Sequence, residues 1–151
     1  MKYWLNSITF CCLRYASTYI DSQSMIIQAI YSLKLTTNSP KISRDCSQAD
    51  YYYEAIQVNV DQSGFYSFSG TSSMDDPNGI LYHIFDPTDP LKDRWFSENR
   101  CNHQGRFQFS VELDKDITYT LVVTTLQSNM IGNFSVTVFG SGNVTLNRIS
   151  E

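Results

Sequence analysis

Apolar and polar residues alternate strictly over long stretches of this chain after residue 50. Between residues 106 and 113 every second side chain is apolar, and the same period returns between 119 and 125, after the charged triplet at 114–116. Successive side chains of a strand point to opposite faces of a sheet. The two runs therefore predict two strands, each with one buried and one exposed face, joined by a charged turn.

The same period predicts five further strands. They lie at residues 51–60, 65–70, 80–85, 131–140 and 143–149, with turns at 75–79 and a proline-containing loop at 86–93. Seven half-buried strands at short, regular spacing are typical of two antiparallel sheets packed face to face. The pattern predicts an all-β chain folded as a two-sheet antiparallel β-sandwich.

The first 45 residues lack this regularity and form a poorly defined N-terminal segment. Residues 22–33 fit either an amphipathic helix or a strand, and the run at 31–37 is similar to the strand predicted at 119–125. Lys2 and the short apolar stretch after it suggest a signal peptide, the alternative being a fragment boundary. We therefore divide the chain into residues 1–45, a leader, a linker or the remnant of a preceding repeat, and residues 46–151, the sandwich.

Composition excludes several classes of function. Hydrophobic residues make up 42% of the chain and aromatic residues 14%, which is enough for a packed core. The formal net charge is −4, and basic residues do not gather beside aromatic ones, which argues against nucleic acid as a partner. No apolar run is long enough for a transmembrane helix.

Cysteines and glycosylation motifs indicate the compartment. Cys46 precedes the first predicted strand and Cys101 lies in the loop at 94–105, and we predict a disulfide between them, worth about 4 kcal/mol for so long a loop. Two free thiols in a reducing compartment are the alternative. Asn133 and Asn143 each begin an Asn-X-Ser/Thr triplet in a stretch expected to be exposed. Together these features predict an extracellular or cell-surface location.

The proline-containing loop supplies candidate metal ligands. Asp86, Asp89 and Asp93 follow one another in it, and Ca²⁺ prefers oxygen ligands of this kind. The alternative is that aspartate is simply favoured in turns and before proline. Ca²⁺ is the one cofactor that the sequence suggests.

Two aromatic residues are candidates for ligand contact. Trp95 and Phe96 lie in a charged stretch predicted to be a loop, where the indole of Trp95 either stacks on a sugar ring or anchors a protein partner, or folds back over a sheet edge. The sequence contains no nucleophile motif, no phosphate-binding glycine loop and no zinc-ligand spacing. We therefore expect a protein without catalytic activity.

The order of these segments resembles a known family. The stretches YEAIQVNV, SGFYSFSG, GRFQFSVELDKDITYTLVVTT and GNFSVTVFG resemble the bacterial pre-peptidase C-terminal domain and the collagen-binding modules of secreted collagenases, over about residues 46–147. Similar repeats occur in large secreted or surface proteins of invertebrates. The resemblance implies a jelly-roll-like sandwich attached to other modules and without activity of its own. Some members bind Ca²⁺ through an acidic turn, but the matching segment here keeps only Glu98 and has gained Cys101.

These observations lead to one expected function and one alternative. The expected function is a non-catalytic extracellular module that contacts a glycan or a matrix protein, or that spaces its neighbours within a multidomain protein. The alternative is an accessory domain of a secreted hydrolase that aids secretion or substrate docking.

Overall fold

A computed structural model describes residues 27–43, 49–97 and 105–149. These residues form eleven strands and no helix. The strands are β1 (Ile27–Leu35), β2 (Lys41–Ile42), β3 (Tyr51–Tyr52), β4 (Glu54–Val60), β5 (Gly64–Ser72), β6 (Pro77–Tyr82), β7 (Arg94–Ser97), β8 (Arg106–Leu113), β9 (Tyr119–Thr125), β10 (Gly132–Gly140) and β11 (Val144–Arg148).

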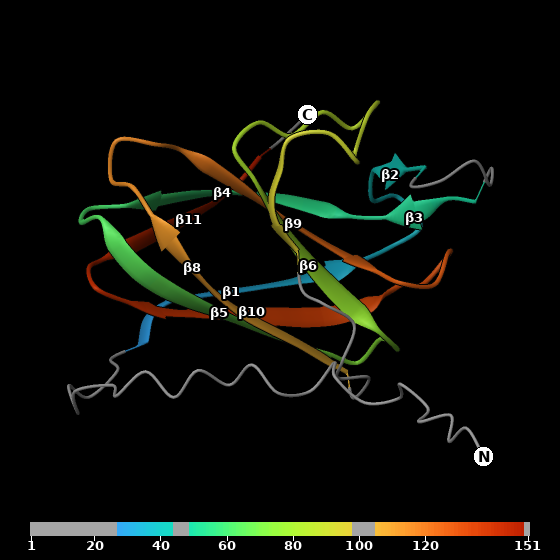
Figure 1. The fold of residues 1–151 in the computed structure, drawn as a ribbon. Coiled ribbons are helices and arrows are strands. Elements are labelled where there is room, and N and C mark those ends of the chain that lie inside the picture. The colour runs from blue at the N-terminus through green and yellow to red at the C-terminus, as the bar shows by residue number, and fades with distance from the viewer. Residues whose placement is uncertain (1–26, 44–48, 98–104, 150–151) are drawn as a thin grey trace, which may run out of the picture.

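Two antiparallel sheets pack face to face, which confirms the predicted β-sandwich (Figure 1). The four-stranded sheet has the order β1-β10-β5-β8, and the five-stranded sheet has the order β11-β4-β9-β6-β7. Without the short strands β2 and β3, this is the strand order of a jelly roll, with β11 added beside β4.

The alternating pattern produces the core between the sheets. Burial along β8 alternates without exception, and its four apolar side chains are at most 9% exposed. β5 and β10, which neighbour each other in the same sheet, likewise bury every second residue, from Tyr66 to Gly70 and from Phe134 to Val138. A shift of one residue in any of these strands would exchange its buried and exposed faces, so the pattern also fixes the register.

The N-terminal segment contributes to this sheet. β1 pairs along its length with β10, Tyr31 lying opposite Val136, and Leu35 is fully buried in the core. The predicted boundary at residue 46 therefore divides a single sheet, and of the two readings of residues 22–33 the strand is correct from Ile27 onward. β1 closes the core where β10 would otherwise be the edge of the four-stranded sheet.

A second, smaller core lies on the outer face of the five-stranded sheet. There Tyr53, Ile80, Tyr82 and Val122 are at most 1% exposed, and Ile42 packs with them from the small sheet formed by β2 and β3. The central strand β9 is consequently buried on both faces, and its alternation is lost in the structure. The sequence predicted one solvent-exposed face on every strand. This prediction is wrong for β9, because other segments cover the outer face of the five-stranded sheet.

One segment predicted to be a turn and one predicted to be a loop each contain part of a strand. β6 begins at Pro77, within the predicted turn at 75–79, because Pro77, Asn78 and Gly79 pair with β9. The predicted loop at 94–105 begins with β7, which pairs with β6. Proline is tolerated at the first residue of a strand because no donor is lost from the ladder interior.

Candidate functional site

The strongest candidate site is a cleft at the side of the sandwich where the outer strands β7 and β8 lie. Its volume is about 280 Å³, and it is lined by Ser63, His83, Trp95, Glu112, Leu113, Asp114, Ile117 and Tyr119. These residues come from both sheets, from the turns β4–β5 and β8–β9, and, in the case of His83, from the connection between β6 and β7. Only the tertiary structure brings them together. We call this the Trp95 cleft.

A short edge strand holds Trp95 in place. The pairing of β6 with β7 shifts register between Leu81 and Tyr82, and such irregularities redirect neighbouring side chains. The Pro90 carbonyl fixes the start of β7 by accepting hydrogen bonds from Tyr82 Oη at 2.7 Å and Arg94 Nε at 3.0 Å. The indole is 49% exposed and stacks on the His83 ring, with centroids 4.2 Å apart. Trp95 therefore presents one apolar face on a rigid support.

His83 is the inner wall of the cleft. Its ring lies between Trp95 and the buried Tyr119, whose ring centroid is 5.3 Å away. The Nε2 atom of His83 is buried and has no hydrogen-bond partner among the residues that the structure describes. Buried polar atoms are usually paired, so this atom is an unsatisfied group in the wall of the cleft.

Acidic and hydroxyl groups form the other wall. The Asp114 carboxylate accepts hydrogen bonds from Ser63 Oγ at 3.1 Å and from the Asp116 main-chain N–H at 3.1 Å. The bond from Asp116, followed by that from Ser63, lowers the pKa of Asp114 below its ordinary value. Asp114 is therefore an ionised, well-oriented hydrogen-bond acceptor at neutral pH, beside an aromatic surface.

The Asp114 turn is expected to lose stability in acid. Because the folded-state pKa of Asp114 lies below the unfolded value, its contribution is present above an ordinary carboxyl pKa of about 3.9 and is lost as pH falls through the folded pKa. Melting temperatures measured from pH 7 to pH 2 should therefore fall less steeply in the acid range for Asp114→Asn than for the unmodified protein. Parallel curves would contradict this assignment.

A second cleft of about 640 Å³ lies on the five-stranded sheet and contains a buried carboxylate. Glu54 is 2% exposed, and its Oε1 accepts a hydrogen bond from Tyr31 Oη at 2.8 Å and lies 3.0 Å from Arg148 Nε. Burial, and then the bond to Glu54, raise the pKa of Tyr31 far above its ordinary value, so the hydroxyl stays protonated as a donor. The three groups satisfy one another, which indicates a structural role.

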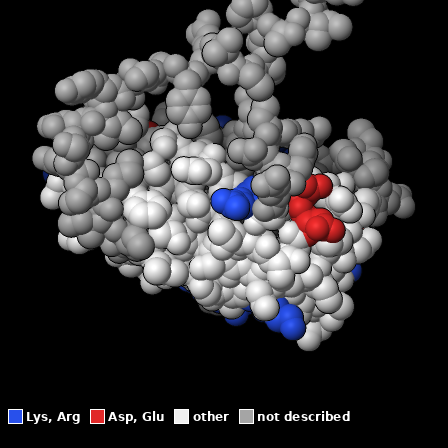
Figure 2. All heavy atoms as spheres, turned by 90° about the horizontal axis from the view of Figure 1, so that it is seen from below, with Lys and Arg blue, Asp and Glu red and all other residues white. Residues whose placement is uncertain are grey.

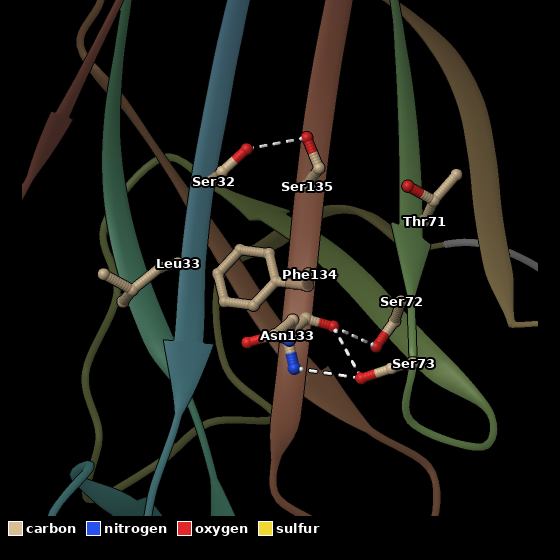
Figure 3. Close-up of a pocket in the computed structure, with 8 residues that line it drawn as sticks. All are labelled: Ser32, Leu33, Thr71, Ser72, Ser73, Asn133, Phe134 and Ser135. Carbon is tan, nitrogen blue, oxygen red and sulfur yellow. Dashed lines mark hydrogen bonds between the residues drawn. The ribbon is translucent and has the colours of Figure 1, made fainter.

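A third groove, of about 530 Å³, crosses β1, β10 and β5 on the outer face of the four-stranded sheet (Figure 3). The hydroxyls of its four serines are paired: Ser32 with Ser135 at 2.9 Å, and Ser72 and Ser73 with the Asn133 main chain. Viewed from that side, the described surface is mostly uncharged (Figure 2). This groove leaves few polar groups for a ligand.

The two sequon asparagines are exposed but differ in their contacts. Asn133 lies on β10 at the groove just described. Asn143 lies in the turn before β11, where its Nδ2 and main-chain N–H each donate to Asp61 at 2.7 Å. Both positions are accessible to an attached glycan, which remains a prediction.

The structure does not assemble the predicted calcium site. Asp86 Oδ1 instead accepts hydrogen bonds from Thr88 Oγ1 at 2.7 Å and Thr88 N at 2.8 Å, which lower the pKa of Asp86. No three acidic, His or Cys side chains come close enough to hold a metal ion within residues 27–43, 49–97 and 105–149. The bonds of Asp86 are those expected where aspartate serves a turn. Calcium binding by Asp86, Asp89 and Asp93 remains a prediction.

Other predicted site residues fall outside this description. Cys46 and Cys101 both lie beyond the described residues, so their disulfide remains a prediction. Phe96 lies on β7, but its side chain is also outside the description. Sequence reasoning named Trp95 but missed its partners His83, Tyr119 and Asp114, which are 12 to 24 residues away along the chain.

Comparison with known proteins adds no family. Neither a family model nor a curated protein matches this sequence. The resemblance to pre-peptidase C-terminal and collagen-binding domains therefore remains a prediction. No described segment forms a helix long and apolar enough to cross a membrane.

Proposed function

We propose that this domain is a non-catalytic binding module whose Trp95 cleft takes one sugar ring of a glycan. The observation that carries the proposal is the half-exposed Trp95 indole, held by its stack on His83 next to the Asp114 carboxylate. An aromatic face packs against the apolar face of a sugar ring. The Asp114 carboxylate would accept hydrogen bonds from hydroxyls at the edge of that ring, and the volume of the cleft suits a single ring.

The charge state of Asp114 favours a role in binding over one in hydrolysis. Glycoside hydrolysis requires a carboxylic acid with a raised pKa that protonates the leaving group. The pKa of Asp114 is lowered by hydrogen bonds from Asp116 in its own turn and from Ser63 in the β4–β5 turn, which makes it a poor general acid at neutral pH. Its bonds to Ser63 and Asp116 support a role in positioning a ligand.

The setting in which this module acts is also part of the proposal. The exposed sequons at Asn133 and Asn143 and the expected disulfide favour an extracellular or cell-surface protein. There the domain would contact a glycan or a matrix glycoprotein, or space neighbouring modules. A docking domain of a secreted hydrolase would use the same cleft, and the residues of the cleft do not separate these two contexts.

A glycan array tests the proposal directly. We expect binding by the full chain, and a loss of at least about tenfold in affinity for Trp95→Ala, since an aromatic anchor at the centre of a site carries much of the binding energy. Ile30→Ala, which removes a side chain that is 63% exposed on the other side of the molecule, is the control and should bind normally. Quenching of tryptophan fluorescence by the bound glycan gives a second readout.

Two outcomes would refute the proposal. One is the absence of any glycan ligand at high protein concentration. The other is a ligand that Trp95→Ala and the unmodified protein bind equally well, because the cleft would then not be the site.

A further inference from the structure

The outer strand β8 offers an edge for pairing. Among the described residues it pairs along one edge only, with β5; it contains no proline and shows no register shift over its 8 residues. The other described outer strands are less suitable: β1 has a register shift near its start, whereas β7 and β11 have only 4 and 5 residues. A long, regular edge strand is a template for pairing with another strand.

In β8, alternate residues form main-chain hydrogen bonds with β5, and the residues between them face the open edge. Ser72 N donates to Gly105 O at 2.9 Å, so odd-numbered residues of this segment bond with β5. Bonded and non-bonded pairs alternate in an antiparallel ladder. The Ser67 and Ser110 hydroxyls approach to 2.6 Å, as expected for the closer, non-bonded pair. The N–H and C=O groups of residues 106, 108, 110 and 112 therefore point away from β5.

The side chains of these four residues are complementary to their own antiparallel copy. Arg106, Gln108, Ser110 and Glu112 are all exposed on the outer face of the sheet. If two β8 strands align with Phe109 opposite Phe109, each Arg106 lies opposite Glu112 and each Gln108 lies opposite Ser110. Every outward side chain then has an opposite charge or a hydrogen-bond partner across the pair, and no like charges face each other.

We propose that β8 pairs with β8 of a second copy of this chain, forming a symmetric dimer in which the two four-stranded sheets become one. A two-fold contact of this kind is self-complementary, as the alignment above requires. Because a single pair of strands buries little area, we expect a transient dimer with a dissociation constant on the order of 1–100 μM. Glu112 also borders the Trp95 cleft, so Arg106 of the second copy lies at the rim of that cleft.

Charge reversal at the two ends of β8 tests the pairing. Sedimentation equilibrium of the full chain, with free thiols alkylated beforehand to exclude intermolecular disulfides, should show a monomer–dimer equilibrium. Arg106→Glu alone and Glu112→Arg alone each place like charges opposite one another twice, and each should weaken the dimer at least about fivefold at low salt. The double variant, and a mixture of the two single variants, should restore association because opposite charges face each other again.

A backbone variant provides the second test. Ser110→Pro removes an N–H that faces the open edge and that β5 does not use, and proline is tolerated at such positions. It should abolish the dimer while circular dichroism stays that of a β-sheet, whereas Ser110→Thr should associate normally. A protein that is monomeric at several hundred micromolar overturns the proposal. So does a dimer that both charge reversals leave unchanged. Trp95→Ala should dimerise normally, so glycan binding and dimerisation can fail separately.

Discussion

Replacing Phe107 with alanine is expected to lower the free energy of unfolding by about 3–5 kcal/mol. The Phe107 ring is 1% exposed and lies against two glycines, Gly70 on the neighbouring strand β5 and Gly79 on β6 of the opposite sheet. A Cβ at either glycine would come within 2.4 Å of a ring atom or closer. The ring thus fills a space that no other described side chain occupies. Urea unfolding followed by circular dichroism measures the loss.

Phe65→Ala is the matched control for this prediction. Phe65 is also an aromatic residue of the four-stranded sheet, but it is 68% exposed on the outer face. Its replacement should change the free energy of unfolding by no more than about 0.5 kcal/mol. Equal effects of the two substitutions would show that β8 does not face the interior in the described register.

Replacing Arg148 with methionine is expected to destabilise the fold by roughly 1–3 kcal/mol. The substitution leaves the Glu54 carboxylate, which is 2% exposed, with only the Tyr31 hydroxyl as a described partner. A fully buried pair would cost more, but the Arg148 side chain is 57% exposed, and solvent screens the remaining charge. Thermal and urea unfolding at neutral pH and moderate salt should both report the loss.

A double variant separates the buried charge from lost packing. Arg148→Met combined with Glu54→Gln removes the charge but keeps an acceptor for Tyr31, so it should be more stable than Arg148→Met alone. Lys41→Met breaks the exposed ion pair with Asp50, whose groups lie 2.8 Å apart, and should leave stability nearly unchanged. If Lys41→Met and Arg148→Met have the same effect, Glu54 is not a buried charge.

Local pattern predicts the interior-facing residues of the four-stranded sheet well. The expected inward residues of β5, β8 and β10 are the observed ones, because one face of each strand meets the core and the other meets solvent. The charged turn after β8 also follows, since Asp114 accepts main-chain bonds from Asp116 and Ile117. This turn leads into β9 of the other sheet, so the two strands that it joins do not pair with each other. The polar outer face of this sheet is mostly uncharged in the structure (Figure 2).

Other features depend on contacts between distant segments. Gly79 is assigned to a turn by its local neighbours Pro77 and Asn78, but it lies in β6, where the absence of a side chain makes room for Phe107. Glu54 is a charged residue, for which an exposed position on its strand is the ordinary expectation. It lies two residues before the buried Ile56, however, so both side chains point to the same, inner face of the sheet. This spacing is a signal that sequence analysis could have used.

The candidate site likewise depends partly on local sequence and partly on contacts between distant segments. The sequence identified Trp95 as an aromatic residue in polar surroundings, but it did not indicate His83, Tyr119 or Asp114 as its neighbours. These residues come from separate strands and turns, and their proximity depends on how the edges of two sheets meet.

The sequence by itself determined that the chain is an antiparallel β-sandwich and which face of the regular strands is buried, because a two-residue period is a local property. The tertiary structure decided that β1 belongs to the sandwich, that the outer face of the five-stranded sheet is covered, and that Trp95 stacks on His83. The physical reason is that these features arise from pairing and packing between segments far apart in the chain, which alternation within one segment does not encode.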